Sequence, residues 1–176
     1  MKQNFIFQTL QDIHIQTSND LIESETKLYL YKNDLNQLTI SKYLLRPLNR
    51  EMRRSMSNLR LGTFDLEIEK GRYTGIPRDH RFCKICDTKE IENESHFILS
   101  CPTLEAIRKP FLDKIKARDH TFNSRDTNSK LIFLYYNNAI SDPIQNIAAE
   151  MLIELKREKN IQSLRQCVTD INPVAI

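Results

Sequence analysis

Three of the chain's four cysteines fall within nineteen residues, in a pattern that suits a metal ion. Cys83 and Cys86 are separated by two residues, His96 follows after nine more, and Cys101 follows after another four. Zinc takes four nitrogen or sulfur ligands at the corners of a tetrahedron, and a Cys-x-x-Cys turn supplies two thiolates from one bend. The spacing C-x2-C-x9-H-x4-C therefore predicts a zinc site made of these four side chains.

Two other uses of the same cysteines must be weighed against zinc: a redox pair or disulfide, and unliganded thiols in the core. Disulfides belong mainly to secreted proteins, and the N-terminus has no pattern typical of a secretory signal, so we expect an intracellular protein, in the nucleus or the cytoplasm. A thioredoxin-like Cys-x-x-Cys lies within a βαβ unit, which this sequence does not indicate. Structural zinc is therefore the favoured interpretation.

The fourth ligand has two candidates, His80 and His96. His80 lies three residues before Cys83 and would share the bend of the first two cysteines, whereas His96 and Cys101 bring a second pair that closes a cage. Four protein ligands leave no open position on the metal, so the site is expected to be structural, with no catalytic residue. The remaining Cys167 is too distant in sequence to be counted as a ligand.

Further landmarks surround the cysteine pattern in a fixed order: Leu59-Arg60-Leu61-Gly62, Glu69-Lys70-Gly71-Arg72-Tyr73, Arg81-Phe82-Cys83-Lys84-Ile85-Cys86, Glu94-Ser95-His96-Phe97 and Cys101-Pro102. Together they resemble the zinc-binding segment found downstream of the reverse transcriptase in non-LTR retrotransposons and in animal open reading frames derived from them. The likeness runs from Leu59 to Arg108. It implies a zinc-dependent accessory region that binds nucleic acid.

The charge of the chain is uneven. Its formal net charge is only +3, yet the stretch 42–84 holds eleven Lys or Arg against five Asp or Glu. Guanidinium groups bind phosphate bidentately, so the basic side chains of this stretch are candidate phosphate contacts in a complex with single-stranded RNA or DNA. The candidates are Arg53, Arg54, Arg60, Arg78, Arg81 and Lys84. Arg81 and Lys84 are also placed to offset the negative charge of a zinc ion bound by three thiolates.

Each of these features also has an ordinary structural explanation. For the arginines of the first basic helix, the alternative is an ordinary solvated face, with Leu48, Met52, Met56 and Leu59 as the buried stripe. Tyr73 and Phe82 lie among arginines, a mixture that suits stacking of unpaired bases, but packing against the zinc site is the alternative.

The fold is expected to be mostly α, a helical domain with a small zinc-knuckle hairpin near the middle. Helices are predicted from Pro47 to Gly62, over 92–99, after Pro102, around Leu131 to Tyr136, and from Asp142 as cap to Lys159. We divide the chain into an N-terminal helical segment (1–40), the basic helix with the zinc module (41–118), C-terminal helices that pack on it (119–162) and a frayed tail (163–176). No apolar run is long enough to span a bilayer.

These observations predict a zinc-binding, nucleic-acid-binding accessory module that is not an enzyme. The alternative is a structural or protein-interaction remnant of a retroelement, in which zinc only stabilises the fold and the apolar helix from Asp142 meets a protein partner. Asp79-His80 beside the zinc site resembles a nuclease arrangement, but the sequence offers no second acidic cluster to support hydrolysis.

Overall fold

The structure is a computed structural model that describes residues 41–137 and 140–171, with side chains up to Gln166. The predicted N-terminal helical segment 1–40 and the side chain of Cys167 lie outside the described residues. Within the described ranges, no helix combines the length and the apolar character needed to cross a membrane.

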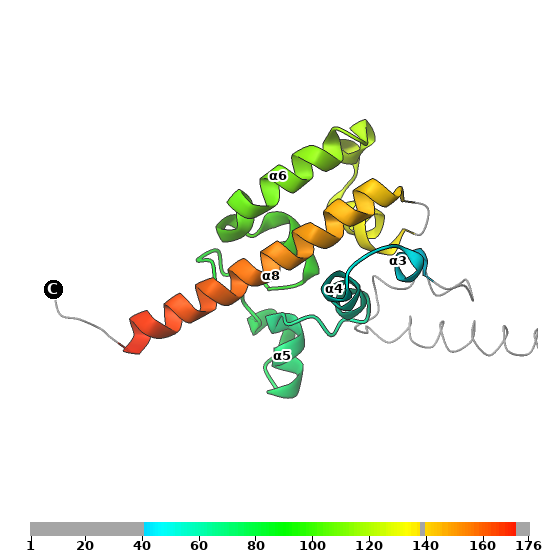
Figure 1. The fold of residues 1–176 in the computed structure, drawn as a ribbon. Helices are drawn as coiled ribbons and strands as arrows, with labels where there is room; N and C mark the ends of the chain where they lie inside the picture. The colour runs from blue at the N-terminus through cyan, green and yellow to red at the C-terminus, as the bar shows by residue number, and fades with distance from the viewer. Residues whose placement is uncertain (1–40, 138–139, 172–176) are drawn as a thin grey trace, which may run out of the picture.

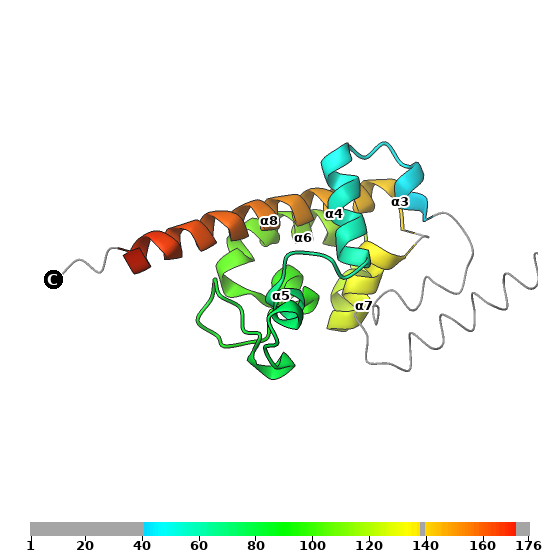
Figure 2. The same cartoon turned by 90° about the horizontal axis from the view of Figure 1, so that it is seen from below.

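The prediction of a mostly α fold is confirmed. Helix α8 (Asp142–Ile171) is the axis of the described structure, with α6 (Glu105–Lys116) along one side and α4 (Arg50–Arg60) packed on another (Figure 1). In both views the C-terminal end of α8 extends past the other described elements (Figure 1 and Figure 2). The shorter elements are α3 (Lys42–Leu45), α5 (Glu67–Tyr73), η1 (Arg78–His80), η2 (His96–Ser100), η3 (Pro102–Leu104), η4 (His120–Ser124), α7 (Thr127–Leu131) and η5 (Ile132–Tyr136).

Helix α4 has the buried stripe that the sequence predicts. It begins after Asn49, whose side chain accepts a hydrogen bond from Met52 N, and the chain leaves it through Gly62 with φ of 58°. An asparagine cap satisfies one of the free N–H groups of the first helical turn. A glycine tolerates the left-handed backbone conformation that follows the last helical turn. Met56 and Leu59 are fully buried, so this helix contributes its apolar side to the core.

The predicted hairpin around the cysteines is not formed as a pair of strands. Among the described residues there is one isolated antiparallel bridge, between Phe82 and Ile91, closed by hydrogen bonds from Cys83 N to Glu90 O (2.8 Å) and from Glu92 N to Arg81 O (2.9 Å). The residues between them form the turn that carries the cysteines, and Lys89 adopts a φ of 54° within it. Among the described residues the pairing does not continue past Ile91, and the next residue, Glu92, is buried.

The C-terminal elements complete the core. Asp126 caps α7 by accepting a hydrogen bond of 3.1 Å from Ser129 N, and η5 buries Leu134, Tyr135 and Tyr136 against α4 and α8. The sequence predicted a frayed tail from residue 163, whereas α8 continues as a regular helix to Ile171. The difference follows from the residues themselves, because Gln162 to Asp170 contain no glycine or proline to end the helix.

Candidate metal centre

The structure brings the four predicted ligands together. One ligand atom from each of Cys83, Cys86, His96 and Cys101 lies within 4.8 Å of every other. In a tetrahedral zinc site with Zn–S bonds of about 2.3 Å, neighbouring sulfurs are about 3.8 Å apart, so a small inward movement suffices. Cys83, His96 and Cys101 are buried, whereas Cys86 is half-buried. The donor set fits a closed structural zinc ion.

The first two ligands, Cys83 and Cys86, lie in the turn between Phe82 and Ile91, which the bridge closes. The bridge fixes the backbone on both sides of the turn, and Thr103 Oγ1 donates a hydrogen bond of 2.7 Å to the carbonyl oxygen of Ile85, between the two cysteines. This contact ties the Cys-x-x-Cys bend to η3, the element that directly follows Cys101. The turn and the second pair of ligands are therefore held against each other without a metal bond.

The second two ligands come from one wide helical turn. Residues His96–Ser100 form a π-helix, and Cys101 N donates to His96 O at 2.7 Å. A π-turn joins residues five apart, and such turns recur at functional sites. The spacing of four residues between His96 and Cys101 thus places both side chains on the same side of the backbone. The backbone therefore turns back at Cys101 and returns its sulfur to the cluster.

His96, and not His80, faces the cysteines. Nε2 of His96 lies 3.3 Å from Cys86 Sγ, while Nδ1 lies 2.6 Å from a carboxylate oxygen of Glu90. Because a carboxylate accepts, Nδ1 carries the donated proton and Nε2 is free to bind a metal. A carboxylate behind a ligating histidine fixes the ring and raises its basicity. His80 is exposed and pairs with Asp79 at 3.0 Å.

The four side chains change one another's acidity. The neighbouring Cys83 sulfur lowers the pKa of Cys101 to about 4, and Cys101 together with burial raises the pKa of Cys83. The same Cys101 sulfur hydrogen bonds to His96 and, with Glu90, raises the pKa of His96 to about 9 against the opposing effect of burial. The Cys101 thiol is therefore more acidic than an ordinary thiol, and the His96 imidazole is more basic than an ordinary imidazole.

Zinc affinity is accordingly expected to rise with pH. Binding must remove a proton from His96 below about pH 9 and from every thiol that is still protonated, and the lowered pKa of Cys101 makes its proton the easiest of these to lose. Each displaced proton contributes about one log unit of apparent affinity per pH unit, so the rise between about pH 6 and pH 8 should be about two log units per unit or more. Competition with a chelator of known protonation constants measures it. The slope of His80→Ala should equal that of the unaltered chain, and a pH-independent affinity contradicts the ligand set.

Charges around the centre differ from those predicted. The guanidinium of Arg81 donates to the carbonyl oxygens of Ile68 (2.7 Å) and Ile76 (2.9 Å), and Lys84 pairs with Glu67 at 2.8 Å. Arg81 packs so closely on Gly71 that a Cβ there would meet it at 2.6 Å. Both side chains thus serve the packing of α5 against the cysteine turn.

Two buried groups that the sequence did not single out contact ligand residues, one through a backbone carbonyl and one beside a sulfur. Arg108, 4% exposed, donates from Nη2 to Cys101 O at 2.9 Å. Burial lowers the pKa of this arginine, while the charge of Cys101 opposes that shift. On the other side Glu92 Oε1 lies 3.8 Å from Cys83 Sγ. A buried arginine at Cys101 compensates negative charge on that side of the cluster.

The predicted phosphate contacts divide into two groups. Arg54, Arg78 and Lys84 are exposed and Arg53 is half-buried, so these four can reach a ligand from solution. Arg60 cannot, because it is 2% exposed and donates to Tyr135 O at 2.6 Å and Ser41 Oγ at 3.1 Å. The prediction that Arg60 contacts phosphate is wrong, since the rings of Tyr43 and Tyr136 enclose its guanidinium. Arg81 is half-buried and occupied by the carbonyls described above.

Comparisons with known proteins found no protein related to this chain. No family profile, no curated protein and no solved structure matches the chain.

Proposed function

We propose that this chain is a structural zinc-binding module that binds single-stranded nucleic acid. The zinc part is supported by the convergence of three sulfurs and one imidazole nitrogen, a donor set that softer divalent metals prefer and that leaves no position for substrate. The likeness to the retroelement zinc-binding segment supplies the class of ligand. Under this proposal the module is an accessory region and not an enzyme.

The observation that carries the nucleic-acid part is the exposed stretch 72–82 beside the cysteine turn. Tyr73 is 82% exposed at the end of α5, and Phe82 is 39% exposed. Arg72 and Arg78 are exposed in the same stretch, and the packing alternative for Tyr73 does not hold at this exposure. Unpaired bases stack on such rings while neighbouring cations follow the phosphates.

The two kinds of contact predict different losses. Tyr73→Ala should weaken binding of single-stranded RNA or DNA by about tenfold, because stacking of one base contributes about 1–3 kcal/mol. Arg78→Gln should reduce the slope of log affinity against log salt by about 0.7, the value for one phosphate contact on a single strand. Filter-binding titrations at several salt concentrations measure both effects. Arg165→Gln, an exposed arginine near the far end of α8, is the matched control and should change neither.

The outcomes separate the two classes of function. If the zinc-loaded chain binds no single strand at low salt, the nucleic-acid proposal fails and a structural or protein-interaction role remains, with α8 as the segment that would meet a partner. If it binds but Tyr73→Ala and Arg78→Gln behave as the control does, the stretch 72–82 is not the binding surface.

A further inference from the structure

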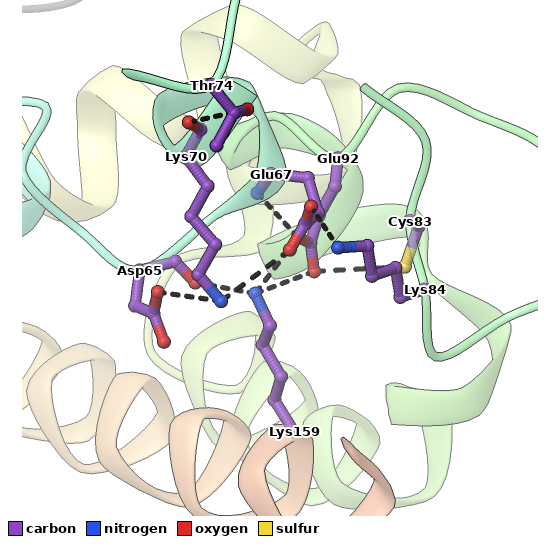
Figure 3. Close-up of polar contacts among 8 residues, drawn as sticks. All are labelled: Asp65, Glu67, Lys70, Thr74, Cys83, Lys84, Glu92 and Lys159. Atoms are coloured by element: carbon purple, nitrogen blue, oxygen red, sulfur yellow. Dashed lines mark hydrogen bonds and ion pairs between the residues drawn. The ribbon is translucent and has the colours of Figure 1, made fainter. Parts of the chain in front are cut away.

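A buried ion pair connects the metal centre to the long helix α8. Glu92 is fully buried and Lys159 is 5% exposed, and each carboxylate oxygen of Glu92 lies 2.9 Å from Lys159 Nζ (Figure 3). Glu92 belongs to the segment between the cysteine turn and η2, whereas Lys159 is 67 residues further along the chain. The same carboxylate lies 3.8 Å from the sulfur of Cys83.

Other contacts leave this pair little freedom to move. Glu92 Oε2 accepts a hydrogen bond of 2.7 Å from Glu67 N, and Ile68 N donates to the Glu92 carbonyl at 3.1 Å. Lys159 Nζ also donates to Asp65 O at 2.5 Å and lies 5.8 Å from the ring of Phe97. Neither charge can reach water without breaking these contacts, so the two must compensate each other within the core.

Metal binding increases the need for that compensation. In a zinc site the sulfur of Cys83 is a thiolate, and three thiolates with one neutral imidazole give the centre a net charge of about minus one. The carboxylate of Glu92 adds a further negative charge beside Cys83, and repulsion between buried charges is strong because the medium is weakly polarisable. Lys159 is positioned to neutralise it.

Lys159 is also the last buried residue of α8 among those whose side chains the structure describes. None of residues 160–166 is buried, and Ile161 and Leu164 are 43% and 68% exposed. The C-terminal end of α8 extends past the body of the described structure (Figure 1). The pair formed with Glu92 is therefore one of the last contacts that attach this end of α8 to the core.

We propose that Glu92 and Lys159 couple occupancy of the metal centre to docking of the distal part of α8. This inference rests on the proposed zinc site. A docked Lys159 favours the metal by offsetting Glu92, and by reciprocity a bound metal favours docking by the same factor. Lys159 is thus a positioning residue of the metal centre, although it touches no ligand atom.

The test compares zinc affinities of the full chain by chelator competition at one fixed pH. Lys159→Met leaves the Glu92 charge uncompensated and should bind zinc about tenfold or more weakly, the usual loss for a group that supports metal ligands. The double variant E92Q/K159M removes both charges and should bind within about threefold of the unaltered chain. E92Q keeps the lysine charge near the thiolate and should bind at least as tightly as the double variant. Lys156→Met, one turn earlier on α8, is the matched control and should leave affinity unchanged.

Hydrogen exchange of residues 156–166 supplies a readout that packing alone would not move. Zinc should slow exchange there in the unaltered chain and have little effect in Lys159→Met. If Lys159→Met fails to fold, the double variant E92Q/K159M carries the test, because zinc should no longer slow hydrogen exchange of residues 156–166 in it. An unaltered chain that binds no zinc contradicts the zinc proposal itself. If all variants bind zinc with equal affinity and zinc has the same effect on hydrogen exchange in each, the proposed coupling is wrong while the zinc site stands.

Discussion

Replacing Cys101 by Ser is expected to abolish tight zinc binding and to destabilise the domain. Cys101 is fully buried, and its sulfur contacts both Cys83 and His96. Zinc binding contributes about 10–16 kcal/mol in small zinc peptides, which matches the whole stability of a typical domain, about 5–15 kcal/mol. Losing a third or more of the zinc-binding free energy should lower the melting temperature by about 10–20 °C for a chain of this length. Calorimetry of the zinc-loaded chains measures the shift.

The size of this effect depends on how the metal centre joins the core. Phe97 and Ile98 follow His96 directly and are buried with Leu104, so the π-turn that carries two ligands also carries core residues. Removing the metal with a chelator should therefore also destabilise the packing of these core residues, and not only the cysteine turn. Cys167→Ser is the control, because this cysteine is not among the predicted ligands. A Cys101→Ser chain that melts within about 2 °C of the unaltered one contradicts a structural metal.

Replacing Arg60 by Ala is expected to cost about 3 kcal/mol of unfolding free energy. The change leaves the buried carbonyl of Tyr135 without this donor, a loss of about 1–3 kcal/mol, and removes a cation from the rings of Tyr43 and Tyr136. Urea denaturation of zinc-loaded protein measures the difference.

Arg54 provides the matched control, because it lies on the same helix and is exposed. Arg54→Ala should change unfolding free energy by no more than about 0.5 kcal/mol. Conversely, the salt dependence of nucleic-acid binding should be the same for folded Arg60→Ala and the unaltered chain. A reduced salt slope in Arg60→Ala would mean that this arginine reaches phosphate after all.

The ligand set was predictable because its information is local. The spacing from Cys83 to Cys101 specifies a bend and a helical turn, and both form as expected around one point. The buried stripe and the end of helix α4 were predictable for a similar reason, since Met56, Leu59 and Gly62 are close in sequence, whereas its start was predicted at Pro47 and lies after Asn49. Helix–coil and ligand-spacing arguments succeed where the partners are close in sequence.

Arg60, Glu92 and Lys159 were not predictable in this way, because their partners are remote in the chain. In the sequence, Arg60 follows Leu59 and resembles a polar residue beside the apolar stripe. In the structure, its guanidinium lies over the rings of Tyr43 and Tyr136. Lys159 reads as an ordinary cation near a helix C-terminus, and Glu92 as an acidic residue of a first helical turn. Only tertiary packing shows that these two charges meet in the core beside a cysteine.

The most direct measurement is X-ray absorption spectroscopy of the zinc-loaded full chain, with metal content determined on the same sample. The account predicts one zinc ion per chain with three sulfur ligands at about 2.3 Å and one nitrogen ligand at about 2.0 Å, and loss of the nitrogen shell in His96→Ala but not in His80→Ala. A first shell that contains oxygen, or a purified chain that retains no zinc after dialysis, contradicts the claim that these four side chains hold one structural ion.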